Sequence, residues 1–376
     1  MGEMTPGGFT QTERIAALRL LRSEHVGPVT WRQLVARFGT AERALAALPD
    51  LARRGGGRAP RIASAANAEA ELTEARRQGV QVLCLGEPAY PPLLASLEDA
   101  PPLLFLRGRA ELLARPAVAL VGARNASGNG RRFAEQLAQG LVREGLVVVS
   151  GLARGIDGAA HEGALAGGGD TVAVVAGGAD VVYPPEHAAL TRRIAEAGAV
   201  LAEMPLGTEP QARHFPRRNR LISGLSRAVV VVEAAPRSGS LITARFAGEQ
   251  GREVLAVPGS PLDPRAQGCN QLIREGATLV QSVADILEAM GPAARHPLAE
   301  PAAPFRGAAP PPDEDDGSLA AARAAVLELL SPVGLAVDEV IRRCQLSAPL
   351  VQVVLLELEL AGRLERQAGN RVALVI

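Results

Sequence analysis

The chain of 376 residues is 47% hydrophobic and 21% charged, the composition of a globular protein with room for two or three domains. Its formal net charge is zero, so no global positive field attracts polyanions, and any affinity for nucleic acid must come from local patterning. No lysine occurs, so all 40 basic residues are arginine, which excludes a P-loop lysine, a Schiff-base lysine and a lysine general base.

The cysteines and histidines predict neither a metal site nor a cofactor. Cys84, Cys269 and Cys344 are odd in number and far apart, which fits no disulfide framework or zinc site and favours a reducing compartment. The five histidines are scattered, without an HExxH pair. The N-terminus is polar through Arg14, and no apolar run approaches the length of a membrane span. We therefore expect a cytoplasmic protein that does not contact membranes.

Residues 11–80 are the first predicted domain, because apolar residues recur with helical periodicity over 11–60. Within it, "HVGPVTWRQLVARFGT" places a glycine turn between two helices and resembles a helix-hairpin-helix or SAM-like unit. In the hairpin version, the amides of the glycine turn contact DNA phosphate. A plain packing module is the favoured alternative, because matches this short often arise by chance.

Residues 82–290 alternate short β-branched runs with helical stretches. Strands are predicted at 117–123, 146–150, 171–177, 199–204, 228–234 and 253–259. Each run is almost continuously apolar, as expected of parallel strands that are covered on both faces. This alternation predicts an α/β domain with a doubly wound, mostly parallel sheet.

The last two predicted segments are a linker and a small domain. Residues 291–317 are rich in proline and alanine and end in "PPPDEDDG", which predicts an extended or mobile linker. Residues 318–376 predict three helices and a short strand pair, an order that resembles a winged helix. The third helix of such a module reads DNA, but "APLVQVVLLELEL" contains two glutamates and no basic residue. A protein-contact or regulatory module is therefore favoured over a DNA reader.

The segments that leave the predicted strands are rich in glycine and arginine. In a doubly wound sheet, ligands bind outside the carboxyl ends of the strands. Glycines let the backbone approach a ligand, and the "SGS" at 238–240 has the form of an anion-holding helix start. Arg124, Arg154, the group at 213–220 and Arg237 are expected to crowd onto this one edge.

The densest arginine cluster lies in "RHFPRRNRLISGLS" at 213–226. From Arg213 to Arg227, both included, there are five arginines, while no acidic residue lies between Glu209 and Glu233. A mononucleotide needs one or two arginines, so this pattern favours a polymer whose phosphates engage successive arginines while a base stacks on Phe215. Double-stranded DNA hides its bases, so single strands are favoured. The alternative is a core phenylalanine beside a solvated arginine face.

Dinucleotide binding is not favoured. "GNGRRF" contains only two glycines of a GxGxxG pattern, and Ser150 ends the second predicted strand, where a ribose-binding acid would be expected.

Together these motifs resemble the DNA-processing protein A family (DprA, also called Smf). "VGARNAS" is similar to the family's VGSR/VGTR turn, with Ala123 at the usual Ser/Thr position. "VVSGLARGIDGAAHEGAL", "VVAGGADVVYPPEH", "HFPRRNRLISGLS" and "VVVVEAAPRSGSLITARFAGEQGREVLAVPG" follow in family order. The resemblance is dense over 117–285. It implies an extended Rossmann-like core between a SAM/helix-hairpin-helix-like domain and a winged-helix-like domain.

The resemblance also implies a function. It implies a non-enzymatic protein that binds single-stranded DNA, forms homodimers, protects incoming strands and helps load the recombinase RecA onto them during natural transformation. The implied binding residues are Gly122, Arg124, Gly151, Arg154, Gly155, Asp157, Arg213, His214, Phe215, Arg217, Arg218, Asn219 and Arg220, supported by Ser238, Gly239 and Ser240. Ala123 lacks the family's hydroxyl, and Arg213 substitutes for nearby lysines. The C-terminal domain remains a candidate contact for duplex DNA or another protein.

Four other residues have two interpretations each. Asp157 and His161 are one helical turn apart, a spacing that suits acid–base chemistry, although an orienting aspartate and a packed histidine are favoured. Tyr183 either stacks on a second base or packs in a turn. Glu203 and Glu233 end strands at the same edge, where they either orient arginines or act as catalytic carboxylates.

Two rival functions follow from these alternatives. An enzyme would resemble the lonely-guy phosphoribohydrolases, which cleave a base from a nucleoside monophosphate, but their PGGxGTxxE signature is absent. An adaptor would use only the terminal domains.

Overall fold

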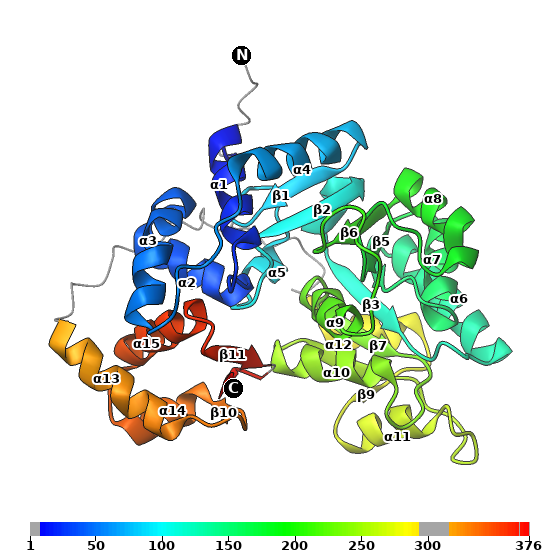
Figure 1. Cartoon of the computed structure of the whole chain (residues 1–376). Helices are drawn as coiled ribbons and strands as arrows, with labels where there is room; N and C mark the ends of the chain where they lie inside the picture. The colour runs from blue at the N-terminus through cyan, green and yellow to red at the C-terminus, as the bar shows by residue number, and fades with distance from the viewer. Residues whose placement is uncertain (1–7, 293–315, 368, 376) are drawn as a thin grey trace. The chain divides into compact units, whose positions relative to one another are not determined.

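The structure, a computed structural model, describes residues 8–292, 316–367 and 369–375 (Figure 1). The predicted linker at 291–317 falls mainly on residues 293–315 and so lies outside the described residues. The chain divides into two compact units, Met1–Ala70 with Phe305–Ile376, and Glu71–Pro304.

The unit Glu71–Pro304 is built on a nine-stranded sheet with the order β1-β2-β6-β5-β4-β3-β7-β8-β9. The strands are β1 (Gln81–Cys84), β2 (Leu103–Gly108), β3 (Ala117–Val121), β4 (Val147–Ser150), β5 (Thr171–Val175), β6 (Ala199–Ala202), β7 (Ala228–Val231), β8 (Glu253–Ala256) and β9 (Thr278–Leu279). Every pairing from β6 to β9 is parallel, whereas β2 pairs antiparallel with both β1 and β6. The predicted α/β fold with a mostly parallel sheet is confirmed. The sequence analysis missed β1, β2 and β9.

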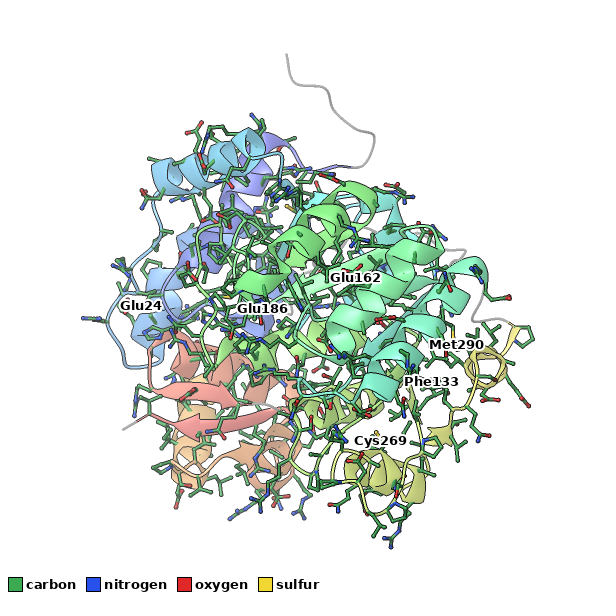
Figure 2. The ribbon with its side chains drawn as sticks, turned by 90° about the vertical axis from the view of Figure 1, so that its right-hand side faces the viewer. Glu24, Phe133, Glu162, Glu186, Cys269 and Met290 are labelled. Atoms are coloured by element: carbon green, nitrogen blue, oxygen red, sulfur yellow. The ribbon has the colours of Figure 1, made fainter. Side chains whose placement is uncertain are left out.

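The central strands are buried along their whole length because helices cover the sheet. The helices of this unit include α6 (Gly128–Arg143), α7 (Ile156–Gly167), α8 (Ala188–Ala197), α9 (His214–Gly224), α10 (Gly239–Glu249) and α12 (Val283–Met290). Val118 and Leu120 of β3 pack in one core cluster with residues of α6, α7 and α12. Met290 and Phe133, which packs against this cluster, are labelled in Figure 2.

The order of the strands creates a switch point at β3. The chain passes from β3 through β4 and β5 to β6 on one side, and α9 then leads to β7 on the other side of β3. A crevice forms at the carboxyl edge where such an order reverses, and it is the usual ligand site of this architecture. The fold therefore brings the loops after β3, β4 and β5 together with the start of α9.

The other unit contains both terminal domains. The N-terminal part has α1 (Gln11–Arg22), α2 (Pro28–Phe38) and α3 (Ala41–Arg54), and α4 (Ala65–Arg77) follows. The C-terminal part has α13 (Asp316–Leu329), α14 (Val337–Cys344) and α15 (Ala348–Leu360). Its strands β10 (Leu335–Ala336), β11 (Leu364–Gln367) and β12 (Arg371–Leu374) pair in the order β10-β12-β11. This arrangement confirms the predicted winged-helix-like domain.

Among the residues that the structure describes, no helix is both long and apolar enough to cross a membrane. The same residues contain no group of three or more His, Cys, Asp or Glu side chains that could hold a metal ion. All three cysteines are free thiols, and burial raises the pKa of the Cys269 thiol to about 12.

Candidate nucleic-acid interface

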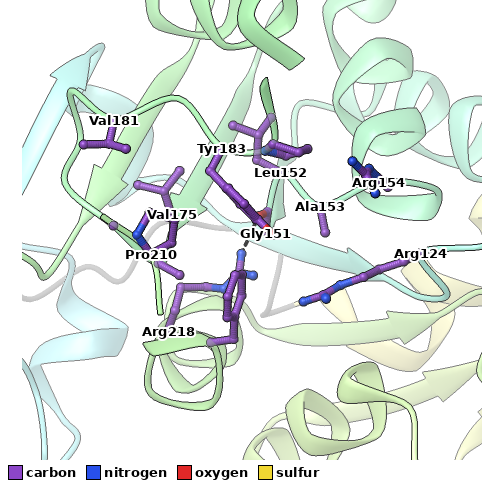
Figure 3. A pocket seen from close by; sticks show the side chains of 14 residues that line it. Arg124, Gly151, Leu152, Ala153, Arg154, Val175, Val181, Tyr183, Pro210 and Arg218 are labelled. Atoms are coloured by element: carbon purple, nitrogen blue, oxygen red, sulfur yellow. Dashed lines mark hydrogen bonds between the residues drawn. The ribbon is translucent and has the colours of Figure 1, made fainter. Parts of the chain in front are cut away.

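A shallow pocket lies at the carboxyl ends of β4 and β5, beside the start of α9 (Figure 3). It is lined by Arg124, Gly151, Leu152, Ala153, Arg154, Val175, Ala176, Gly177, Val181, Tyr183, Pro184, Pro210, Phe215 and Arg218. Its volume is about 60 Å³, which is room for a few water molecules, whereas pockets that enclose small molecules hold about 300–1,000 Å³. The pocket therefore suits a group that lies against the surface.

Phe215 stands at the centre of an aromatic and cationic cluster. Its ring centroid is 5.8 Å from that of Tyr183, with the planes tilted by 58°. The guanidinium carbons of Arg124 and Arg218 lie 5.0 and 5.9 Å from the Phe215 centroid, within cation–π range. Tyr183 is 46% exposed and Phe215 is half-buried, so both rings keep accessible surface. The phenylalanine among the arginines is thus neither a core residue nor freely solvated.

Arg218 is buried and braces the protein itself. Its Nη1 donates to the carbonyl oxygens of Gly151 and Val174, at the ends of β4 and β5, and the first bond is drawn as a dashed line in Figure 3. Burial lowers the pKa of the guanidinium to about 10, so it stays protonated at neutral pH. Arg218 lines the pocket while its Nη1 is engaged by these two carbonyls, and its contact with DNA stays a prediction.

Asp157, at the start of α7, holds the loop after β4. Its Oδ2 accepts hydrogen bonds from the amides of Gly151 at 3.1 Å and Ala153 at 3.4 Å. Burial raises the pKa of the carboxyl, while the charge of Arg218 and these two amides oppose the rise. Asp157 therefore holds the loop after β4 through these two amides, and its part in DNA binding stays a prediction.

At the glycines of the expected site, a side chain would clash with neighbouring atoms. A Cβ on Gly151 would lie 2.0 Å from Nη1 of Arg218, and a Cβ on Gly122 would lie 2.6 Å from Cγ1 of Ile156. Gly155 has a φ of +76°, and its Cβ would come within 2.2 Å of the carbonyl oxygen of Ala123. These glycines let the loops pack closely around the pocket.

The 213–220 segment is divided by the faces of α9. His214, Arg218, Asn219 and Arg220 are buried, whereas Arg213 and Arg217 are exposed. Asn219 Nδ2 donates to the carbonyl oxygen of Gly239 at 3.1 Å. Arg220 Nη2 donates to Glu203 at 2.7 Å, and its Nε lies 3.4 Å from Asp99. Asn219 and Arg220 therefore brace α9 in this structure, and their contacts with DNA stay predictions.

His214 faces the same interior. Its Nδ1 accepts from the amide of Gln211 at 3.3 Å, and burial lowers the pKa of the ring. His214 is the first residue of α9, and its contact with DNA stays a prediction.

Arg124, Arg213, Arg217 and Arg237 are the exposed arginines of this edge. Within the described ranges none of the four forms an ion pair, so their charges are available. Arg154 is also exposed but pairs with Glu186, which raises the pKa of the arginine and lowers that of the glutamate. Because exposed pairs are weak, this arginine can exchange its partner for a phosphate.

The serines at 238–240 form the start of α10. Ser238 is the N-cap, and its hydroxyl lies 2.8 Å from that of Ser240. The carbonyl of Gly239 receives the Asn219 amide, so this helix start is joined to α9. This arrangement is compatible with the predicted role of residues 238–240, which is to support the binding site.

The remaining candidates are engaged by protein groups. His161 is fully buried, and its Nδ1 donates to the Thr171 hydroxyl at 2.8 Å, because that hydroxyl donates to Val148. Burial lowers the pKa of His161 to about 3, which agrees with packing and not with acid–base chemistry. Glu233 accepts from the amide and hydroxyl of Ser127 and so anchors the N-cap of α6.

Two partners were missed by sequence reasoning. Asp99 and Glu186 pair with Arg220 and Arg154 from other loops. No local signal identified them, because they lie far from their partners along the chain.

Comparison with known proteins gives a family match over most of the unit Glu71–Pro304. The family model described as DNA recombination-mediator protein A matches residues 81–291. The chain belongs to the DprA family. The model of the family's N-terminal HHH domain matches residues 11–74, and that of its winged helix domain matches 308–370. This is a DNA-processing family rather than a family of enzymes.

Three relatives show the extent of the similarity. Protein Smf of Escherichia coli is 43% identical over 289 residues, which are 76% of this chain and 75% of that protein. DNA processing protein DprA of Streptococcus pneumoniae is 51% identical over 198 residues, 53% of this chain and 70% of that protein. Its X-ray structure aligns with a TM-score of 0.57 over 64% of this chain and 86% of that one.

The third relative is DNA processing protein A of Helicobacter pylori, whose structure is described as giving insights into a unique single-stranded DNA binding mode. It aligns with a TM-score of 0.52 at 28% identity, over 56% of this chain and 95% of that chain.

Proposed function

We propose that the chain binds single-stranded DNA along the edge that carries Phe215. Arg124, Arg213 and Arg217 would contact phosphates, and a base would lie on the exposed side of the Phe215 and Tyr183 rings. The observation behind this proposal is the aromatic pair at 5.8 Å beside exposed arginines that have no ion-pair partner within the described ranges. Base–aromatic stacking contributes about 1–3 kcal/mol per base and tolerates any sequence.

The buried members of the expected set have a different role in this proposal. Asp157, Arg218, Asn219 and Arg220 hold the loops and α9 in place, so that the exposed groups face one strand. The small volume of the pocket supports a surface contact with a polymer over the enclosure of a nucleotide.

The test is a titration of fluorescent oligo-dT and a matched duplex at two salt concentrations. Wild type should bind the single strand more tightly than the duplex, and Arg217→Glu should bind both weakly. Arg143→Glu is the matched control, because Arg143 is also exposed but ends α6, at the opposite edge of the sheet. Equal affinity of wild type and Arg217→Glu would contradict the proposal, and release of a base from nucleoside monophosphates would favour the enzyme.

Phe215→Ala separates stacking from charge in the same assay. Affinity should fall by about 1–3 kcal/mol with little change in the salt dependence, because a phenyl ring releases no counterions. If this variant changed the salt slope while Arg217→Glu did not, the assigned roles would be reversed.

We also propose the family's finer functions for this chain: protection of incoming single strands, RecA loading during natural transformation, homodimer formation and a cytoplasmic location. Family membership supports them. Light scattering over a range of concentrations tests the dimer. RecA assembly on strands coated with single-strand-binding protein, with and without this chain, tests loading.

A further inference from the structure

Helix α15, the helix that reads DNA in a winged helix, is buried on two sides. One side packs in the domain's own core through Val351, Val354, Leu355 and Leu358. Leu356 and Leu360 are only 2% and 0% exposed, yet neither belongs to that core cluster. These two residues are one helical turn apart and therefore form a second apolar stripe, which needs a partner of its own.

The partner in the structure is the chain's own N-terminal domain, since α15 packs against α3 in the same compact unit. The two domains come close together at the glycine run "GGG" that follows α3. A Cβ on Gly55 would lie 2.1 Å from the carbonyl oxygen of Glu357, and one on Gly57 would lie 2.5 Å from that of Ala361. The backbones of the two domains therefore meet without intervening side chains.

Polar groups close the rim of this contact. The Gln33 amide on α2 donates to Gln352 of α15 at 2.9 Å and accepts from Arg366 of β11 at 3.1 Å. Arg363, just after α15, donates to the carbonyl oxygen of Gly55 at 3.2 Å. Both domains thus supply donors and acceptors in fixed positions, as in a specific interface.

The charges of α15 are unsuited to DNA. The helix has no basic residue, and Glu357 and Glu359 are both buried and paired with arginines of the C-terminal domain, Arg323 and Arg366. The helix therefore has no cation of its own to contact phosphates, and its two carboxylates already hold the nearest arginines.

We propose that α15 is the docking helix for the N-terminal domain, so that the two terminal domains act as one body and the winged helix does not read duplex DNA through α15. This inference does not depend on the proposed single-strand site, which lies in the other unit.

The test uses the full chain with a protease site inserted between Pro292 and Asp316. After cleavage, the C-terminal fragment of the wild type should still co-elute with the rest of the protein in size-exclusion chromatography. Gly55→Ala and Gly57→Ala should weaken this association by about ten-fold or more, since the added methyl groups meet α15 backbone. Neither glycine has a positive φ, so the substitutions should leave the N-terminal helices folded.

Gly27→Ala is the matched control, because this glycine lies in the same domain and a Cβ there would meet nothing within 4 Å. Its fragments should co-elute as in the wild type, and circular dichroism should show equal helix content in all variants. Hydrogen exchange of α15 in the uncleaved chains gives a second measurement, with faster exchange expected only in the Gly55 and Gly57 variants.

Three results would overturn the inference. The first is separation of the cleaved wild-type fragments, and the second is retention of the fragment by both Gly55→Ala and Gly57→Ala. The third is duplex binding by the uncleaved wild-type chain that is lost in uncleaved Gln352→Glu, because α15 would then read DNA while the domains are joined.

Discussion

Arg217 and Arg218 are neighbours in the chain but lie in different environments. Arg217 points from α9 into solvent, whereas Arg218 reaches under the pocket and donates to the ends of two strands. Each residue turns about 100° around the helix, so adjacent side chains fall on different faces. The arginine cluster therefore has exposed guanidinium groups on one side, which are the proposed phosphate contacts, and a set of braces on the other.

Substitution of these two arginines should separate the roles. Arg218→Met should lower the free energy of unfolding by about 2–4 kcal/mol, because it leaves the carbonyls of Gly151 and Val174 without donors and Asp157 without a nearby cation. Arg217→Met should change it by less than about 0.5 kcal/mol. Urea denaturation of the two variants measures both values, and similar losses would show that Arg218 is not a brace.

The buried His161 should make stability depend on pH. Its pKa is about 3 in the folded protein, against an ordinary value of 6.5, so unfolding takes up a proton below pH 6.5. The stabilisation is fully present above pH 6.5 and is lost as the pH falls toward 3. The contribution of His161 to the free energy of unfolding should therefore fall by about 1 kcal/mol between pH 7 and pH 5.5.

Denaturation of wild type and His161→Asn at both pH values tests this expectation. The asparagine amide can still donate to Thr171 but does not titrate, so this variant should lose that part of the pH dependence. His214, whose pKa burial also lowers, should retain its own contribution in the same direction in both proteins. An unchanged pH dependence would contradict the assignment to His161.

At the scale of elements, α6 and α7 are joined through small residues. A Cβ on Gly163 would lie 2.2 Å from the carbonyl oxygen of Glu135, so the helices approach at backbone distance. This close packing positions Asp157 in the first turn of α7 and Ser127 at the start of α6. The loops of the site therefore depend on a helix pair that contains none of the four exposed arginines proposed for the site edge, Arg124, Arg213, Arg217 and Arg237.

Gly163→Ala should consequently lower the free energy of unfolding by about 1–3 kcal/mol, because the helices must separate. Gly128→Ala is the control, since a Cβ at this position of α6 would meet nothing within 4 Å. The control should be neutral or stabilise by about 0.5–1 kcal/mol through the helix preference of alanine. Thermal or urea denaturation measures the free energy of unfolding of both variants. Equal changes at the two positions would contradict the packing argument.

At the scale of the whole molecule, net charge is zero, and the positive edge is a local feature. Association with DNA should therefore depend on the few exposed arginines rather than on long-range attraction. Three phosphate contacts predict a slope of about −2 for the logarithm of the binding constant against the logarithm of salt concentration, at about 0.7 per contact on single strands.

Arg124→Ala or Arg217→Ala should each reduce this slope by about 0.7, whereas Arg143→Ala should leave it unchanged. Fluorescence titrations of oligo-dT at four salt concentrations measure the slopes. A slope far steeper than about −2 would show that other arginines take part.

Much of the fold was predictable because its signals are local in the chain. All six predicted strands correspond to β3 to β8, since continuous apolar runs between glycine-rich turns have few other solutions. β1 and β2 were missed because they pair antiparallel at one end of the sheet, and β9 because it has only two residues. Local patterning does not reveal such pairings.

The sequence by itself determined the architecture, the edge of the sheet that carries the candidate binding site, and the residue types found at that edge. Those follow from periodicity and from the rule that ligands bind outside the carboxyl ends of parallel strands. Only the tertiary structure decided which of these arginines are exposed and have no ion-pair partner among the described residues. The segment from Glu209 to Glu233 is acid-free along the chain but not in space, since Glu203 and Asp99 reach Arg220 from other loops. Burial and pairing depend on residues that are distant in the chain, which is why no local pattern could supply them.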